Sequence, residues 1–290
     1  MPTSDLENNR ICCKFKELVL ENRPALICYV VAGYPTLKYT EEIVSTIVKS
    51  GADIVEIGIP FSDPIADGPT IQKASTVALK NGTTPQKCLE LVGAVREKFP
   101  RLPLLIMTYS NIVFRSGLEE FLKTSRLKGV DGFILPDLEL TESYSYVNAA
   151  SKLKMATVFL ASPNTDASRL KKIMEVCSGF LYVVSVYGTT GSRVEYEDYT
   201  FQSIRRIKEI TEGKIPIAVG FGISRPDQVT SLVNSGADGV IIGSAIIDRI
   251  AAPPPNHKQK LVNIRAFVQQ LSEACLQTPI TSENHRYLQF

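Results

Sequence analysis

SGADIVEIG, residues 50–58, decides the fold of this chain, because it joins the end of a helix to a short apolar strand. Glycine is typical of a helix end, and a brief β-branched run bounded by a second glycine is typical of a buried parallel strand. The segment SGADGVIIG, residues 235–243, has the same form near the other end of the chain. The two segments indicate one βα unit that the chain uses repeatedly.

Short apolar runs of this kind alternate with amphipathic helical patterns along most of the chain. They begin at Ala25, Ile54, Leu104, Gly132, Ala156, Phe180, Ile215 and Gly239. Alternation of strand and helix predicts a parallel sheet with right-handed crossovers, and eight units favour a closed barrel over an open doubly wound sheet. The sequence therefore predicts an α/β fold consisting of a single (β/α)8 TIM barrel.

The segments at the two ends of the chain lie outside the eight units. Residues 1–24 predict a short extra helix, with Phe15, Leu18, Val19 and Leu20 apolar, that plugs the bottom of the barrel. A Pro-rich break over residues 252–259 precedes a closing helix over 261–275, and residues 276–290 are expected to form a flexible tail. We expect a single domain over residues 1–290, with the barrel at about 25–275.

Composition excludes several classes of protein. The 32 Lys and Arg against 30 Asp and Glu give a net charge of +2, which argues against nucleic-acid and anionic-membrane partners. No apolar stretch is long enough for a membrane span, and the N-terminal residues resemble neither a signal nor a transit peptide. The spacing of the six cysteines does not match a zinc or redox motif. The chain has only two histidines, both near the C-terminus, so a His-ligated metal site or a Ser-His-Asp triad is not expected. A cytoplasmic protein with reduced cysteines and no metal is expected.

Glu56 is the anomaly of the second strand. Alternation places Val55 and Ile57 toward the helices and Glu56 inside the barrel, where a carboxylate is costly unless it is paired, hydrogen-bonded or protonated. Burial should raise the pKa of Glu56, which suits a group that gives and takes a proton near neutral pH. The alternative is a structural glutamate that barrel-lining hydroxyls satisfy.

The loop after this strand, PFSDPIADGP over residues 60–69, carries two more carboxylates. Asp67 follows Glu56 by eleven residues, so both side chains can face one cavity at the strand ends, where barrel enzymes place their sites. Two carboxylates in different environments can divide acid and base roles. The alternative is a turn in which Asp63 and Asp67 cap the helix at Thr70.

Glycines after the seventh and eighth strands indicate an anion site. Gly222 and Gly243 follow these strands, and Ser244 opens a short helix, which matches the phosphate sites of barrel enzymes. The loop over residues 187–193 is expected to be a lid or a third edge of the phosphate site. Aromatic residues at strand ends, Tyr29, Tyr109, Tyr182 and Phe221, favour a flat apolar ligand. Together these features predict an aromatic phosphate ester as the ligand.

Five segments resemble one known family. They are EIGIPFSDPIADGPTIQ from Glu56, LIMTYSNIVFRSGLEEF from Leu105, GVDGFILPDL from Gly129, VGFGISRPDQV from Val219 and GADGVIIGSAII from Gly236. In this order they resemble the α subunit of tryptophan synthase over about residues 25–250. The resemblance implies a lyase of tryptophan biosynthesis that cleaves indole-3-glycerol phosphate to indole and glyceraldehyde 3-phosphate by a retro-aldol reaction, without cofactor or metal.

The resemblance also implies residue roles. Glu56 matches the proton-shuttling glutamate, and Asp67 matches the aspartate that binds the indole N–H. The substrate-binding positions fall on Tyr29, Met107, Tyr109, Tyr182, Thr190 and Phe221, and the phosphate-binding positions on Gly191, Gly222, Gly243 and Ser244. An α2β2 complex is implied, with pyridoxal phosphate on the β subunit alone, and Asp63, Pro64 and Asn111 match interface positions.

The chain departs from the family pattern in its pocket and its lid, and two alternative functions also remain open. Tyr29 stands where many members have Phe, and the lid over residues 187–191 differs from the usual sequence. A stand-alone lyase that releases free indole would share the same site. A non-catalytic activator of a β subunit would be expected to lack Glu56 or Asp67, and both are present.

Overall fold

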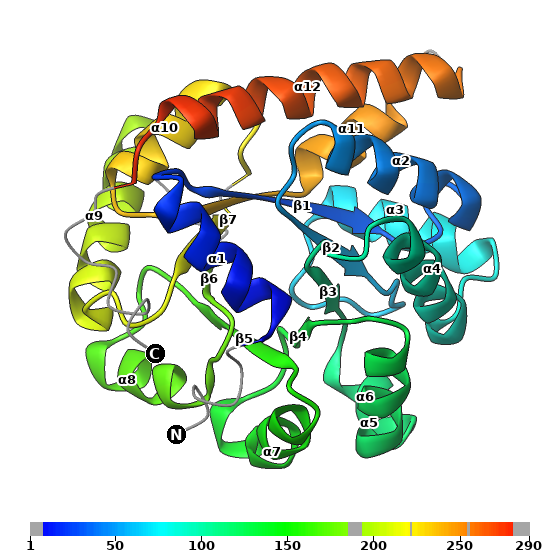
Figure 1. Cartoon of the computed structure of the whole chain (residues 1–290), viewed down its shortest axis with the longest axis horizontal. Helices are drawn as coiled ribbons and strands as arrows, with labels where there is room; N and C mark the ends of the chain where they lie inside the picture. The colour runs from blue at the N-terminus through cyan, green and yellow to red at the C-terminus, as the bar shows by residue number, and fades with distance from the viewer. Residues whose placement is uncertain (1–7, 185–192, 221, 254–255, 281–290) are drawn as a thin grey trace.

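Eight parallel strands close into a barrel in the order of the sequence, with β8 hydrogen-bonded to β1 (Figure 1). The computed structural model describes residues 8–184, 193–220, 222–253 and 256–280, and only the backbone of residues 193–198. The strands are β1 (Ala25–Val31), β2 (Ile54–Gly58), β3 (Leu104–Met107), β4 (Gly132–Ile134), β5 (Ala156–Ala161), β6 (Leu181–Val184), β7 (Ile217–Gly220) and β8 (Gly239–Ile242). The predicted (β/α)8 barrel is confirmed.

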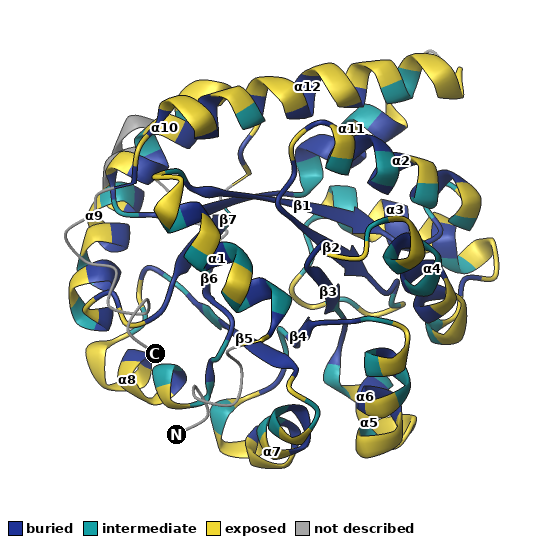
Figure 2. Cartoon of the chain, viewed as in Figure 1, coloured by how far each residue is buried: buried dark blue, intermediate teal, exposed yellow. Residues whose placement is uncertain are grey.

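Helices surround the barrel and turn their apolar sides toward it (Figures 1 and 2). They are α1 (Arg10–Leu20), α2 (Leu37–Lys49), α3 (Pro69–Lys80), α4 (Pro85–Lys98), α5 (Ser110–Arg115), α6 (Leu118–Leu127), η2 (Leu140–Glu142), α7 (Tyr144–Lys152), α8 (Ala167–Val176), α9 (Arg193–Thr211), α10 (Pro226–Asn234), α11 (Ser244–Ala251) and α12 (His257–Gln277). Proline opens α3, α4 and α10, where its missing N–H costs nothing.

Two apolar layers hold the barrel together. Val55 and Ile57 belong to the layer between strands and helices, whereas Ile54 belongs to the cluster inside the barrel, as strand alternation requires. Three α1 side chains, Ile11, Phe15 and Leu18, join the inner cluster. α1 therefore closes the bottom of the barrel, as predicted (Figure 1).

One apolar residue of the predicted N-terminal helix lies outside its buried face. Leu20 is 84% exposed, because it is the last residue of the helix and lies off the buried face. Ile11, at the start of the helix, was not singled out from the sequence pattern and is fully buried.

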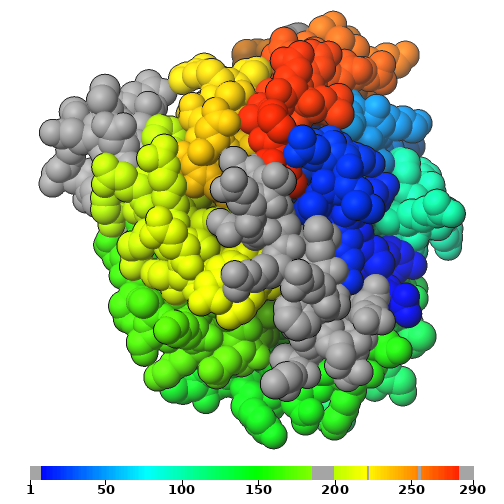
Figure 3. Space-filling view, turned by 60° about the vertical axis from the view of Figure 1, so that its left-hand side comes forward, coloured from blue at the N-terminus to red at the C-terminus, as the bar shows by residue number. Residues whose placement is uncertain are grey.

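α12 packs against α2 and α10, so the last helix closes the ring beside the first βα unit (Figure 3). It begins at His257, inside the predicted Pro-rich break, because the Asn256 side chain caps it by accepting the Lys258 N–H. It also continues into the predicted tail, and Thr278 and Ile280 beyond it are buried. Part of the predicted tail is thus helical or buried, and its remaining residues, 281–290, lie outside the described residues.

Reciprocal hydrogen bonds join each odd strand to the next even strand at the bottom of the barrel. In each pair, the residue before the even strand donates its backbone N–H to the carbonyl of one residue of the odd strand. The side chain of the donating residue in turn accepts the backbone N–H of that odd-strand residue. The pairs are Asp53 with Leu26, Asp131 with Leu104, Ser178 with Thr157 and Asp238 with Ile217, all at 2.8–3.0 Å. The Ala-Asp step of the opening motif therefore ties neighbouring strands together.

Cations neutralise the three aspartates of these pairs. Arg23 lies 2.9 Å from Asp53, Arg96 lies 2.7 Å from Asp131, and Lys208 lies 2.7 Å from Asp238. Because these aspartates are buried, each charge needs its partner. The bottom of the barrel is thus dedicated to stability, and the opposite end is left for binding.

Candidate active site

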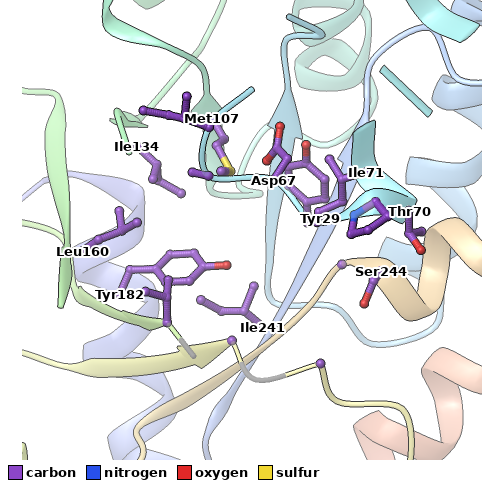
Figure 4. A pocket seen from close by; sticks show the side chains of 18 of the residues that line it. Tyr29, Asp67, Thr70, Ile71, Met107, Ile134, Leu160, Tyr182, Ile241 and Ser244 are labelled. Atoms are coloured by element: carbon purple, nitrogen blue, oxygen red, sulfur yellow. The ribbon is translucent and has the colours of Figure 1, made fainter. Parts of the chain in front are cut away.

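A cavity of about 500 Å³ opens at the carboxyl ends of the strands (Figure 4). Of the residues singled out from the sequence, it is lined by Tyr29, Asp67, Met107, Tyr182, Gly222, Gly243 and Ser244. They come from segments far apart in the sequence, and the barrel topology brings them together at one end, where parallel barrels place their binding sites.

Glu56 lies inside the barrel and is fully buried. It stands opposite Tyr29 in the register of β1 and β2, so it belongs to the layer that borders the cavity. Neither carboxyl oxygen has a hydrogen-bond partner among the described residues. Burial raises the pKa of Glu56 from 4.5 to about 8. The hydroxyl partners that a purely structural glutamate would need are not found among the described side chains.

Asp67 reaches the cavity from the loop between β2 and α3. Its Oδ1 atom is buried and has no hydrogen-bond partner among the described residues. Burial raises the pKa of Asp67, and a hydrogen bond with the Tyr109 side chain acts against this rise. Asp67 is not the cap of α3, because Gly68 occupies that position without a side-chain hydrogen bond. The alternative in which Asp67 is only a helix cap was therefore wrong.

Tyr109 supports this loop and is not among the residues that line the cavity. Its hydroxyl accepts the Ala66 N–H at 3.1 Å, and its ring centroid lies 4.9 Å from that of Phe61. The structure therefore places Tyr109 behind the loop that follows β2, whereas the family resemblance implied direct packing on a substrate ring.

Tyr29 and Tyr182 each lie over a glycine of the neighbouring strand. A Cβ atom on Gly58 would meet the Tyr29 hydroxyl at 2.2 Å, and one on Gly220 would meet the Tyr182 hydroxyl at 2.9 Å. Both glycines are needed because any side chain would collide with a ring. The Tyr182 hydroxyl points into the cavity (Figure 4).

The other end of the cavity has features that are typical of an anion site. Gly222 has a φ of +66°, which favours glycine, and α11 begins directly after Gly243. A helix N-terminus offers unpaired backbone N–H groups and a positive dipole end, and Ser244 adds a hydroxyl. These three residues therefore lie where a phosphate group can be bound.

Several residues that line the cavity were not predicted from the sequence. They are Ile65, Ala66, Gly68, Pro69, Thr70, Ile71, Ile134, Leu160, Val184, Gly220, Ile241 and Asp248. The apolar strand residues among them could have been found from strand alternation. The Thr70 hydroxyl and the Asp248 carboxylate, 3.2 Å apart, join α3 to α11 and gave no such signal.

Other predicted residues lie elsewhere. Thr190, Gly191 and Phe221 are outside the described residues, as is most of the predicted lid. Asp63 and Asn111 are exposed and Pro64 is half-buried, on segments that follow β2 and β3 at the cavity end of the barrel. In the described ranges, no group of three His, Cys, Asp or Glu side chains could hold a metal ion, and no helix is long and apolar enough to cross a membrane.

Comparison with known proteins identifies the family to which this chain belongs. The model of the tryptophan synthase alpha chain family matches residues 15–276. The tryptophan synthase alpha chain of Methanothermobacter thermautotrophicus is 43% identical over 250 residues, which cover 86% of this chain and 92% of that protein. That of Methanocaldococcus jannaschii is 47% identical over 81% of this chain and 82% of its own length.

A solved structure agrees with the sequence comparison. The crystal structure of tryptophan synthase subunit alpha from Legionella pneumophila has a TM-score of 0.83 and 31% identity, and the match covers 92% of this chain and 98% of that one. The chain therefore belongs to the tryptophan synthase alpha chain family, whose members are lyases that cleave indole-3-glycerol phosphate.

Proposed function

We propose that this chain cleaves indole-3-glycerol phosphate to indole and glyceraldehyde 3-phosphate, with Glu56 and Asp67 as its catalytic carboxyl groups. The observation that carries the proposal is the burial of Glu56, without a hydrogen-bond partner among the described residues, next to a cavity that has Asp67 at one end and a helix N-terminus at the other. Family membership supports the alpha-chain function and favours neither the stand-alone lyase nor the non-catalytic activator.

Glu56 performs the proton transfers of this proposal. Retro-aldol cleavage requires a proton at indole C3 and removal of the proton from the side-chain hydroxyl, after which the C–C bond breaks and the aldehyde forms. A carboxyl group with a pKa of about 8 is present in both protonation states near neutral pH. Glu56 can therefore donate a proton at one stage and accept one at another.

Asp67 accepts a hydrogen bond from the indole N–H in this proposal. When C3 is protonated, positive charge develops on the ring nitrogen, and a carboxylate that accepts its N–H stabilises that charge. Asp67 lines the cavity, and its buried Oδ1 atom has no hydrogen-bond partner among the described residues, so the carboxylate has acceptor capacity left for the N–H group of a ligand.

Substrate binding follows from the remaining cavity residues. Tyr29, Met107 and Tyr182 offer the rings and the apolar side chain for the indole, with Phe221 and Thr190 as further proposed contacts outside the described residues. Gly222, Gly243 and Ser244 bind the phosphate, together with Gly191. The phosphate end fixes the substrate so that the reacting bond lies toward the carboxyl groups.

The partner of this chain is a tryptophan synthase β subunit, as the family implies. We propose an α2β2 assembly in which Asp63, Pro64 and Asn111 contact the β subunit, since they lie at the cavity end of the barrel, and Asp63 and Asn111 are exposed there. The pyridoxal phosphate of the enzyme belongs to the β chain, and none is expected on this chain.

Domain organisation and location complete the proposal. A single domain over residues 1–290 is supported by the closed barrel and by α1 and α12, which pack on it. A biosynthetic family and six cysteines without a disulfide support the cytoplasm.

Indole release tests the proposed function. The purified full chain is incubated with indole-3-glycerol phosphate, alone and with an added β subunit, and indole and glyceraldehyde 3-phosphate are measured. We expect both products in equal amounts, formed faster when the β subunit is present. Absence of both products under both conditions would refute the proposal. The mass of the complex, from light scattering, tests the α2β2 stoichiometry.

A further inference from the structure

The Tyr29 hydroxyl is a polar group that the proposed reaction leaves without a role. Tyr29 is 5% exposed and lines the cavity. Its ring is confined between two strand ends, because a Cβ atom on Gly58 would lie 2.2 Å from the hydroxyl and one on Gly243 would lie 3.3 Å from Cδ1. Two close approaches of this kind hold the ring, and with it the hydroxyl, in one place.

The hydroxyl points to the part of the cavity that holds Asp67. Figure 4 shows the Tyr29 hydroxyl directed toward Asp67, and both residues line the same cavity. Charge on Asp67, and then on Glu56, adds to burial in raising the pKa of Tyr29, so the phenol keeps its proton and remains a donor. Asp67 Oδ1 has no hydrogen-bond partner among the described residues, and the Tyr29 hydroxyl belongs to the lining of the same cavity. A hydroxyl donor and an unpartnered carboxylate acceptor therefore face the same cavity.

We propose that Tyr29 is a positioning residue for Asp67: its hydroxyl donates a hydrogen bond to Asp67 Oδ1 after a rotation of the carboxylate, and so holds it ionised toward the indole nitrogen. The catalytic part of this inference rests on the proposed function, whereas the hydrogen bond itself does not. Because the bond is made to the charged form, it opposes the effect of burial on the pKa of Asp67.

Other groups near Asp67 do not supply a charge of opposite sign. The titratable groups around it are Glu56 from β2, Asp63 in the same loop, Tyr109 after β3, Tyr182 from β6 and Asp248 from α11. The described residues that line the cavity include no Lys, Arg or His. An ionised Asp67 carboxylate can therefore be stabilised in this cavity only by neutral hydrogen-bond donors of the described residues.

Tyr29→Phe tests the inference, because it removes the hydroxyl and keeps the ring between the two glycines. We expect the pKa of Asp67 to rise by about one unit, since a donor to a carboxylate lowers its pKa. A ¹³C NMR titration of the carboxyl groups in the full chain measures this pKa, with Asp67→Asn used to assign the signal. The acidic limb of the kcat/KM profile should move upward by the same amount, with KM little changed at neutral pH.

Tyr39→Phe is the matched control. The Tyr39 hydroxyl donates to the His257 carbonyl at 3.0 Å, on the outside of the barrel, so this variant should leave both the pKa of Asp67 and the pH profile unchanged. An Asp67 pKa in Tyr29→Phe that equals the wild-type value would overturn the inference. If the wild-type chain released no indole, the proposed function would fail, and the NMR titration would still decide whether Tyr29 and Asp67 interact.

Discussion

Glu56 on β2 lies directly opposite Tyr29 on β1, and this pairing sets a fully buried carboxyl group beside the wall of the cavity. The pairing follows from the parallel register and from alternation, which puts Ile54 in the apolar interior and Glu56 one layer nearer the open end. A chain selected for stability alone would place an apolar residue there. The position of this carboxyl group supports the proton chemistry proposed for it.

The pH dependence of stability should reveal the buried Glu56. Its pKa is about 8 in the folded chain and near 4.5 when unfolded, so the unfolded state loses the proton first as pH rises. Stability from this group is thus lost between about pH 4.5 and 8, by up to roughly 1.4 kcal/mol per pH unit. The glutamine in Glu56→Gln does not titrate. The free energy of unfolding of this variant, measured in urea, should therefore rise relative to that of the wild type between pH 5 and pH 8. Parallel curves for the two proteins would refute the raised pKa.

Asp67→Asn should reduce indole formation by at least about a hundredfold, because an amide carries no negative charge to stabilise the protonated ring. Steady-state kinetics with indole-3-glycerol phosphate measure this loss. Asp63→Asn is the matched control in the same loop, since the Asp63 side chain is exposed and should not affect the reaction of the isolated chain. Wild-type turnover in Asp67→Asn would remove Asp67 from the mechanism.

Ser244→Asp should weaken substrate binding by about tenfold or more, since it puts a negative charge at the first turn of α11, where the phosphate is expected. Affinity for glycerol 3-phosphate, measured by calorimetry, reports this site without the reaction. Ser168→Asp, exposed in the first turn of α8, is the control and should bind as the wild type does. Equal affinities in all three proteins would place the phosphate elsewhere.

Asp238→Ala should lower the free energy of unfolding by about 3–5 kcal/mol, because it leaves the Lys208 charge buried and uncompensated and takes the acceptor from the Ile217 N–H. Urea unfolding monitored by circular dichroism measures the loss. Glu139→Ala removes the exposed ion pair with Arg169 and should cost less than about 1 kcal/mol. If both variants lost equal stability, the reciprocal bonds at the bottom of the barrel would not have the role assigned to them.

Much of the fold could be predicted because each strand carries its own local signal. Gly51 and Asp53 mark a helix end and a strand start, and the apolar runs are long enough to exclude surface segments. The boundaries near the C-terminus were less accurate, because Asn256 starts α12 through a side-chain cap and Ile280 is held by packing rather than by a periodic pattern.

The site was predictable only in part. Alternation alone places Glu56 inside the barrel, and chain order places Asp67 at its mouth. The contact between Tyr109 and the Ala66 N–H, and the Thr70–Asp248 bond, join segments whose separation in the sequence carries no periodic signal. Such contacts depend on how loops fold over the strand ends, which a pattern of residue types does not encode.

The most direct test is indole release by Glu56→Gln compared with the wild-type chain, each with a saturating β subunit. Glutamine keeps the size of the side chain and cannot transfer the proton, so indole formation should fall by at least about a thousandfold while glycerol 3-phosphate binds with unchanged affinity. Unchanged binding with lost turnover would place Glu56 in the chemical step. Turnover at the wild-type rate in Glu56→Gln would contradict the assignment of Glu56 as the proton-transferring group.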